Sequence, residues 1–255
     1  MTPLVIFAFA LAGLMIGSFL NVCIYRLPRR ESIVWPASHC TTCNRQLAWY
    51  GNVPVVSWLV LRGRCRGCGS RISVMYPLVE LTTSAVFAGG VLVYGLSPLL
   101  FVRLAFGCAL IVLFMIDLQH QILPNAITLP GIVAGFLASL FLPPGWLSSL
   151  IGIVAGGGIL WALAEAYYRL RGIEGLGMGD VKMLAMIGAV LGWPLMLLTL
   201  VVASFAGSLV GVGLMAFGRG GMQAALPFGT FLALGALFAA VVGDPILSWY
   251  LQFYQ

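Results

Sequence analysis

The chain has 255 residues, of which 61% are hydrophobic and only 8% are charged. A soluble domain carries roughly 25% charged residues, so this composition excludes an ordinary soluble protein and favours an integral membrane protein. The formal net charge is +6. Because the basic residues lie between apolar stretches, we expect them to set membrane orientation and we expect no binding to nucleic acid.

Eight apolar segments predict membrane-spanning helices, because about 20 apolar residues are needed to cross a bilayer. In chain order they are residues 3–25, 77–96, 98–118, 122–142, 146–168, 179–192, 194–217 and 226–251. The break at Gly192-Trp193-Pro194 separates the sixth segment, which is short, from the seventh. We therefore expect an all-α polytopic membrane protein with about eight transmembrane helices.

Charge divides the chain into three predicted parts. These are a first transmembrane helix at residues 1–25, a hydrophilic insert at residues 26–75, and a transmembrane domain at residues 76–255. The insert holds eight arginines against one acidic residue, Glu31, so the positive-inside rule places it in the cytoplasm. With that orientation twelve of the 13 basic residues are cytoplasmic, Arg103 is the exception, and both termini lie outside the cytoplasm.

Four cysteines of the insert have the spacing of a metal site. Cys40-x2-Cys43 and Cys65-x2-Cys68 form two pairs, a pattern typical of zinc held by four thiolates with no open position for water. We expect one structural zinc ion here, because the insert has few apolar residues with which to build a core of its own. Two disulfides are the alternative, which the reducing conditions of the cytoplasm disfavour.

Two of the seven acidic residues are candidates for catalysis. Asp117 ends the third predicted span and Asp180 opens the sixth, both on the cytoplasmic side. Two close carboxylates cannot both ionise at low cost, so one keeps a proton. The ionised group can take a proton from water while the other polarises a peptide carbonyl. Glycines before Asp180 would let a substrate backbone approach, so the pattern indicates an aspartic protease.

The residues alone leave other interpretations open. Asp180 follows Gly179 at a helix start and could serve only as a cap, while Asp117 could be a solvated residue at a helix end. A transporter that relays protons through both aspartates is a rival hypothesis, although its carboxylates would lie near the bilayer midplane. Another rival hypothesis is a scaffold protein that is anchored by zinc and catalyses no reaction. Glu80 and Glu174 are candidates for supporting roles, the latter for positioning the pair.

Four motifs in this order resemble those of the type IV prepilin peptidases, membrane enzymes of type IV pilus and type II secretion systems. They are residues 17–28, the two Cys-x2-Cys pairs, residues 117–128 with Leu-Pro-Asn at 123–125, and Gly-x-Gly-Asp-Val-Lys at residues 177–182. Together they extend over about two thirds of the chain. The Gly-x-Gly-Asp motif alone is weak, whereas the four in this order are specific.

The resemblance implies that Asp117 and Asp180 are the catalytic residues of a peptidase domain at residues 76–255. It implies that the basic leader of a prepilin or pseudopilin is removed after a glycine. The new N-terminal residue, commonly phenylalanine, would then be methylated with S-adenosylmethionine. The resemblance also places the protein in the bacterial inner membrane, with the active site at the cytoplasmic face of the lipid bilayer.

Methylation has weaker support in the residues. By resemblance the zinc insert is associated with it, but no strand–loop–helix for a nucleotide is visible. The sequence therefore locates no S-adenosylmethionine pocket, and Asn21, Arg26 and the insert are where one would be sought. A peptidase without methyltransferase activity is the alternative. The sequence predicts no oligomeric state.

Overall fold

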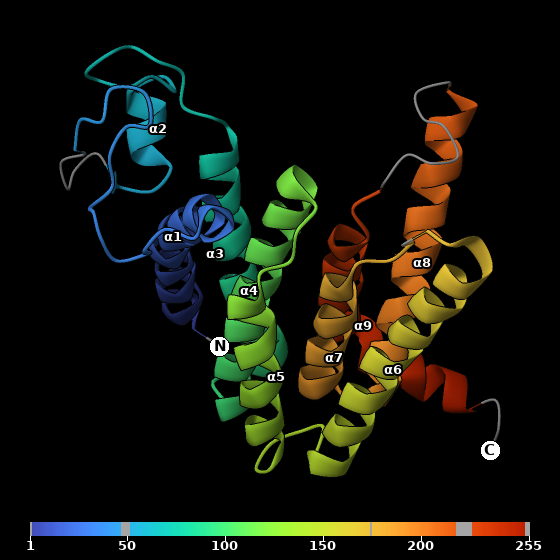
Figure 1. Cartoon of the computed structure of the whole chain (residues 1–255). Coiled ribbons are helices and arrows are strands. Elements are labelled where there is room, and N and C mark those ends of the chain that lie inside the picture. Colours follow the sequence, from blue (N-terminus) through green and yellow to red (C-terminus); the bar gives the residue numbers. More distant parts are fainter. Residues whose placement is uncertain (1, 47–51, 174, 218–225, 253–255) are drawn as a thin grey trace. The chain divides into compact units, whose positions relative to one another are not determined.

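The structure is a computed structural model that describes residues 2–46, 52–173, 175–217 and 226–252. In these ranges the regular structure is helical, apart from two isolated antiparallel bridges in the insert, which confirms the all-α prediction. The elements, shown in Figure 1, are α1 (Pro3–Arg26), the 3-10 helix η1 (Leu27–Arg29), α2 (Val56–Val60), α3 (Met75–Tyr94), α4 (Pro98–His120), α5 (Asn125–Ser139), α6 (Trp146–Arg171), α7 (Met178–Leu191), α8 (Trp193–Ala216) and α9 (Phe228–Leu251).

Each of the eight predicted spans forms a helix, but the helices differ in length. Six of those in the described ranges are long and apolar enough to cross a membrane, namely α1, α3, α4, α6, α8 and α9. The other two, α5 and α7, have 15 and 14 residues, so each is about 22 Å long, less than the ~30 Å hydrocarbon core. The extended residue Pro124 delays the start of α5, and Gly192, at φ 80°, ends α7. The protein is thus a multi-pass membrane protein.

The chain forms two compact units, Met1–Val112 and Leu113–Gln255, and the division falls inside α4. The first unit contains α1, α2, α3 and the first part of α4. The second contains the end of α4 and α5 to α9. The three predicted domains, which were separated by charge and hydropathy rather than by packing, stay a prediction.

In the first unit, glycines allow α1 to pack closely against α3. A Cβ added to Gly13 would lie 2.7 Å from the Cα of Ser84, and one added to Gly17 would lie 2.7 Å from the Cα of Glu80. A side chain at either glycine would therefore overlap the backbone of α3 and force the helices apart. The pair forms the support from which the insert leaves at the end of α1 and to which it returns at the start of α3.

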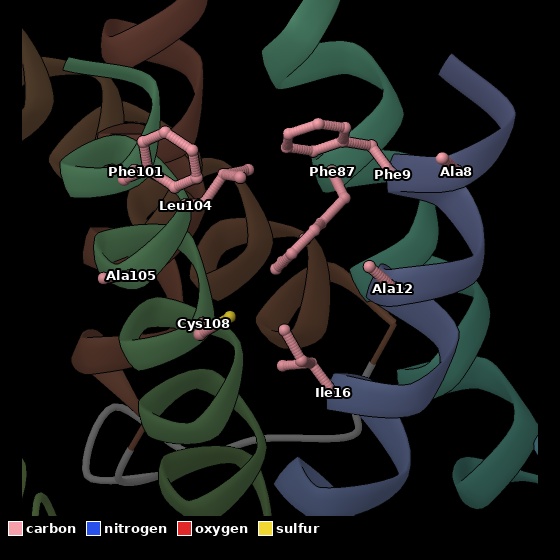
Figure 2. Close-up of a pocket in the computed structure, with 9 residues that line it drawn as sticks. All are labelled: Ala8, Phe9, Ala12, Ile16, Phe87, Phe101, Leu104, Ala105 and Cys108. Carbon is pink, nitrogen blue, oxygen red and sulfur yellow. The ribbon is translucent and has the colours of Figure 1, made fainter. Parts of the chain in front are cut away.

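An apolar pocket of about 490 Å³ opens between α1, α3 and the start of α4 (Figure 2). It is lined by Ala8, Phe9, Ala12, Ile16, Phe87, Phe101, Leu104, Ala105 and Cys108. The lining includes no carboxylate, imidazole or basic group. This pocket therefore offers no residue for peptide cleavage, and Cys108 serves as part of its apolar wall.

In the second unit, α7 is the central helix and contacts α5, α6, α8 and α9 (Figure 1). Its residues from Met183 to Leu191 are all buried, as expected for a helix that is apolar on every side. Glycines again permit the close contact: a Cβ on Gly156 of α6 would lie 2.8 Å from the carbonyl oxygen of Leu184. Neighbouring helices therefore hold α7 in place, and this helix carries Asp180 in its first turn.

Candidate active site and metal centre

Asp117 lies in the last turn of α4, and its side chain is buried. Its Oδ2 accepts a hydrogen bond from the N–H of Thr230 at 2.8 Å, and the amide of Gly229 also donates to the carboxyl group. Both amides belong to the first turn of α9, where backbone N–H groups have no acceptor within the helix. Asp117 is therefore a buried carboxyl group held by another helix, not a solvated residue at a helix end.

Asp180 lies in the first turn of α7, three residues after Gly177, which precedes the helix. The Gly177 backbone N–H donates to its carboxyl group, which is the geometry of a capping interaction. Asp180 is therefore not the N-cap residue, a position that Gly177 occupies, but its carboxyl group caps the helix start from within the first turn. Such a cap leaves the carboxyl group free to take part in chemistry as well, because it engages only part of the acceptor capacity of two oxygens.

The structure brings the two predicted aspartates into one site, although 63 positions separate them along the chain. Asp180 is near enough to Asp117 for the two groups to interact electrostatically. Both lie at helix ends, Asp117 three residues before the end of α4 and Asp180 at the start of α7.

Leu123, in the connection between α4 and α5, packs between two glycines of this site. A Cβ on Gly179 would lie 2.9 Å from the Cβ of Leu123, and a Cβ on Gly229 would lie 3.0 Å from its Cδ1. The expectation that Gly179 makes room for a substrate backbone therefore needs correction, because Leu123 fills that space. Gly177 differs, since a Cβ there would make only an ordinary 3.5 Å contact with Asp180 Oδ2.

A hydrogen bond joins the motif at residues 117–128 to the motif at residues 177–182. Lys182 donates from Nζ to Oδ1 of Asn125 at 3.0 Å, linking the N-terminal parts of α7 and α5. Its ammonium group is therefore engaged with an amide. The bond thus connects the two motifs that contain the aspartates.

The sequence interpretation missed Gly229 and Thr230, which contact Asp117. The available signal was Pro227-Phe228-Gly229-Thr230 at the start of the last apolar segment, since proline before a helix marks its start. Nothing in the sequence paired that turn with Asp117, 113 residues away. Glu174, predicted to position the pair, lies outside the described residues.

The four predicted metal ligands lie together in the insert. The Sγ atoms of Cys40, Cys43, Cys65 and Cys68 are all within 4.8 Å of one another, and those of Cys40 and Cys68 are 3.9 Å apart. A tetrahedral zinc ion with Zn–S bonds of about 2.3 Å requires S–S separations of about 3.8 Å. All four cysteines are free of disulfides, so the cluster could hold one metal ion.

The two cysteine pairs have the same backbone geometry. The N–H of Cys40 and that of Cys65 each donate to the carbonyl five residues later, and the residue four positions later donates back, at 2.8–2.9 Å. That fourth residue has positive φ in both pairs, 54° at Asn44 and 71° at Gly69. Asparagine and glycine adopt this conformation at low cost, so each pair forms its turn from local sequence.

Hydrogen bonds favour the thiolate form of two of the four cysteines. The backbone amide of Cys43, followed by that of Thr42, lowers the pKa of Cys40 to about 6. The hydroxyl and the amide of Ser70 likewise lower the pKa of Cys68. The backbone amide of Arg45 alone would lower the pKa of Cys43, but desolvation and the contacts with the neighbouring cysteines together raise that pKa to about 11. Since the thiolate is the form that binds a metal, Cys40 and Cys68 are the two ligands that the protein itself prepares for a divalent ion.

The polar residues at the junction of insert and helices bind the protein backbone. Arg26 is buried and donates from Nη1 to the Ser32 carbonyl at 2.8 Å and from Nη2 to the Pro36 carbonyl at 2.7 Å. On α3, Oε2 of the buried Glu80 accepts the N–H of Val55 at 2.7 Å. These side chains therefore fasten the insert to α1 and α3.

Comparison with known proteins agrees with these motifs. Residues 11–94 match the bacterial peptidase A24 N-terminal domain, and residues 104–212 match the type IV leader peptidase family.

The chain is 38% identical to a prepilin leader peptidase/N-methyltransferase of Aeromonas salmonicida strain A449, over 95% of this chain and 92% of that protein. It is 37% identical to one from Pseudomonas putida, over 94% and 91%. A Myxococcus xanthus relative of the same name is 43% identical over 85% of this chain and 65% of its own length. No solved structure gives a significant match. The protein belongs to the type IV leader peptidase family.

Proposed function

We propose that this protein removes the basic leader from prepilins or pseudopilins and then methylates the new N-terminus. The observation that supports peptidase activity is that Asp117, near the end of α4, and Asp180, at the start of α7, lie in one site. Relatives similar over nearly the whole chain are named prepilin leader peptidase/N-methyltransferase, which supports both activities.

The chemistry of cleavage needs one ionised and one protonated carboxyl group. The ionised group removes a proton from water, whose oxygen attacks the carbonyl carbon of the scissile peptide. The protonated group donates to the carbonyl oxygen, giving a neutral tetrahedral diol. On collapse of the diol the C–N bond breaks, the protonated carboxyl group gives its proton to the leaving amine, and the ionised group takes a proton from a diol hydroxyl. The pair then again holds one proton, as it did at the start of the cycle.

We place the site at the cytoplasmic face of the bacterial inner membrane. Support comes from the arginine-rich insert between α1 and α3, which the positive-inside rule assigns to the cytoplasm. A prepilin with a basic leader before an apolar helix would insert with the leader on that same side. The position of Asp117 near the end of α4, away from the helix centre, favours a scissile bond at headgroup level over a midplane proton relay.

For the insert we propose one structural zinc ion held by Cys40, Cys43, Cys65 and Cys68. The mutual distances of the four sulfur atoms support this assignment, and four thiolates leave no position for a catalytic water. The ion would hold together a segment whose only described α-helix, α2, has five residues. S-adenosylmethionine would supply the methyl group that the pilin N-terminal amine accepts as it loses a proton.

The test of the peptidase is cleavage of a prepilin by purified protein in lipid nanodiscs. Asp117→Asn and Asp180→Asn should each abolish the shortened product while the protein remains inserted and monodisperse. Glu165→Gln is the matched control, because Glu165 forms an exposed ion pair with Arg169. Normal cleavage by either asparagine variant would refute the pair, and no cleavage by the unaltered protein would favour the transporter or the scaffold.

The test of methylation uses the same reaction with radiolabelled S-adenosylmethionine. Label should pass to the cleaved pilin and not to the uncleaved precursor, because only cleavage creates the free amine. A protein that cleaves the precursor fully and transfers no label would be a peptidase without methyltransferase activity. Zinc is measured on the same sample by elemental analysis, with one ion per chain expected.

A further inference from the structure

The contact between Asp117 and the start of α9 distinguishes the two aspartates. Asp117 receives two backbone amides, from Gly229 and Thr230, whereas the amide that donates to Asp180 comes from Gly177. Amides at a helix N-terminus favour a negative charge on their acceptor. The first turn of α7 also favours a charge on Asp180, but Asp117 receives two direct amide hydrogen bonds against one.

Gly229 makes this arrangement possible. A Cβ at this position would lie 2.9 Å from Oδ2 and 3.1 Å from Cγ of Asp117, and 3.0 Å from Cδ1 of Leu123. Carbon atoms in proteins do not pack against a carboxyl group this closely, so any other residue would displace either the first turn of α9 or Asp117. In the same turn, the Thr230 hydroxyl donates to the Pro227 carbonyl, which closes the turn on itself.

We propose that the first turn of α9 keeps Asp117 as the ionised member of the pair, and that Gly229 is the positioning residue that lets this turn reach it. Asp180 then holds the proton and polarises the scissile carbonyl. This assignment rests on the proposed aspartic-peptidase function and adds the role of each carboxyl group. Asp180 is the titratable group of α7 that interacts with Asp117, while α9 and the α4–α5 connection present backbone amides and Leu123.

The experiment compares Gly229→Ala with Gly213→Ala in leader cleavage between pH 4 and pH 9. Gly213 lies in α8, and a Cβ there meets nothing within 4 Å, so this variant controls for the glycine-to-alanine change itself. With the amides displaced, Asp117 gives up its proton less readily. We expect Gly229→Ala to lower kcat at least tenfold at neutral pH and to move the acidic limb of the profile upward by about one pH unit.

Three results would overturn the proposal. One is a Gly229→Ala profile equal to that of Gly213→Ala. A second is a uniform loss of rate with an unchanged acidic limb, which would mean that Gly229 serves packing alone. A third is a rise in KM with unchanged kcat. Thermal unfolding of both variants in nanodiscs is measured alongside, and rates are compared only below the unfolding transition. Because Asp117→Asn tests the pair itself, failure of this assignment is distinguishable from failure of the peptidase proposal.

Discussion

Glu80→Ala should release the insert from the helices that hold it. Glu80 is buried on α3, and its Oε2 accepts the N–H of Val55, the residue before α2, at 2.7 Å. Val55 has φ 60°, a conformation that a β-branched residue adopts only under constraint. The hydrogen bond to Glu80 is a constraint that holds the insert in this conformation.

The magnitude follows from the lost hydrogen bond, because a hydrogen bond to a charged group contributes about 1.5–3 kcal/mol. Backbone strain at Val55 is relieved on opening in both proteins, so it cancels in the comparison. We expect the free energy of local opening to fall by about 1.5–3 kcal/mol, which raises the open population roughly 10- to 150-fold.

The assay is hydrogen exchange of the backbone amides in the insert, measured on the full chain in nanodiscs. Exchange around Val55 should accelerate in Glu80→Ala by the factor given above. Glu80→Gln should give a smaller effect, since its amide oxygen can accept the same N–H without the added strength of a charge. Glu31→Ala, in an exposed acid of the insert, is the control. Unchanged exchange in Glu80→Ala would refute the role of this bond.

Two other changes test the packing of α7 and the metal centre. Gly156→Ala should lower the free energy of unfolding, measured by chemical denaturation, by about 1–3 kcal/mol, because the added Cβ would lie 2.8 Å from the Leu184 carbonyl oxygen. The control is Gly158→Ala in the same helix, where a Cβ meets open space. This variant should be neutral or slightly stabilising in the same measurement. Cys65→Ser should abolish zinc retention, since the hydroxyl is a poor zinc ligand. Because Cys65 is buried, the variant should also make the insert more susceptible to limited proteolysis. A zinc content equal to that of the unaltered protein would contradict the four-cysteine site.

Local patterns in the sequence were sufficient for much of this structure. The membrane character follows from composition, and all eight apolar segments are helices. The four-cysteine cluster could be predicted from the spacing of the two pairs, because each pair forms a turn of a few residues whose geometry depends on nearby residues alone. The prediction for α7 was accurate to one residue at each end, because Gly192 marks its end in the sequence. The length of α5 was overestimated, because hydropathy does not register that the helix starts only after Pro124 and ends at Ser139.

The relation between distant segments is what only the tertiary structure decided. The sequence by itself determined that Asp117 and Asp180 lie at helix ends, and the ordered motifs determined the family, now confirmed by its relatives. It did not reveal that α9 donates two amides to Asp117, that Leu123 fills the space beside Gly179, or that Glu80 holds Val55. Spacing along the chain specifies contacts within one turn or one helix. Contacts across 113 residues depend on which helix faces pack together, and this depends on small residues such as Gly156 and Gly229 whose role becomes visible only beside their neighbours.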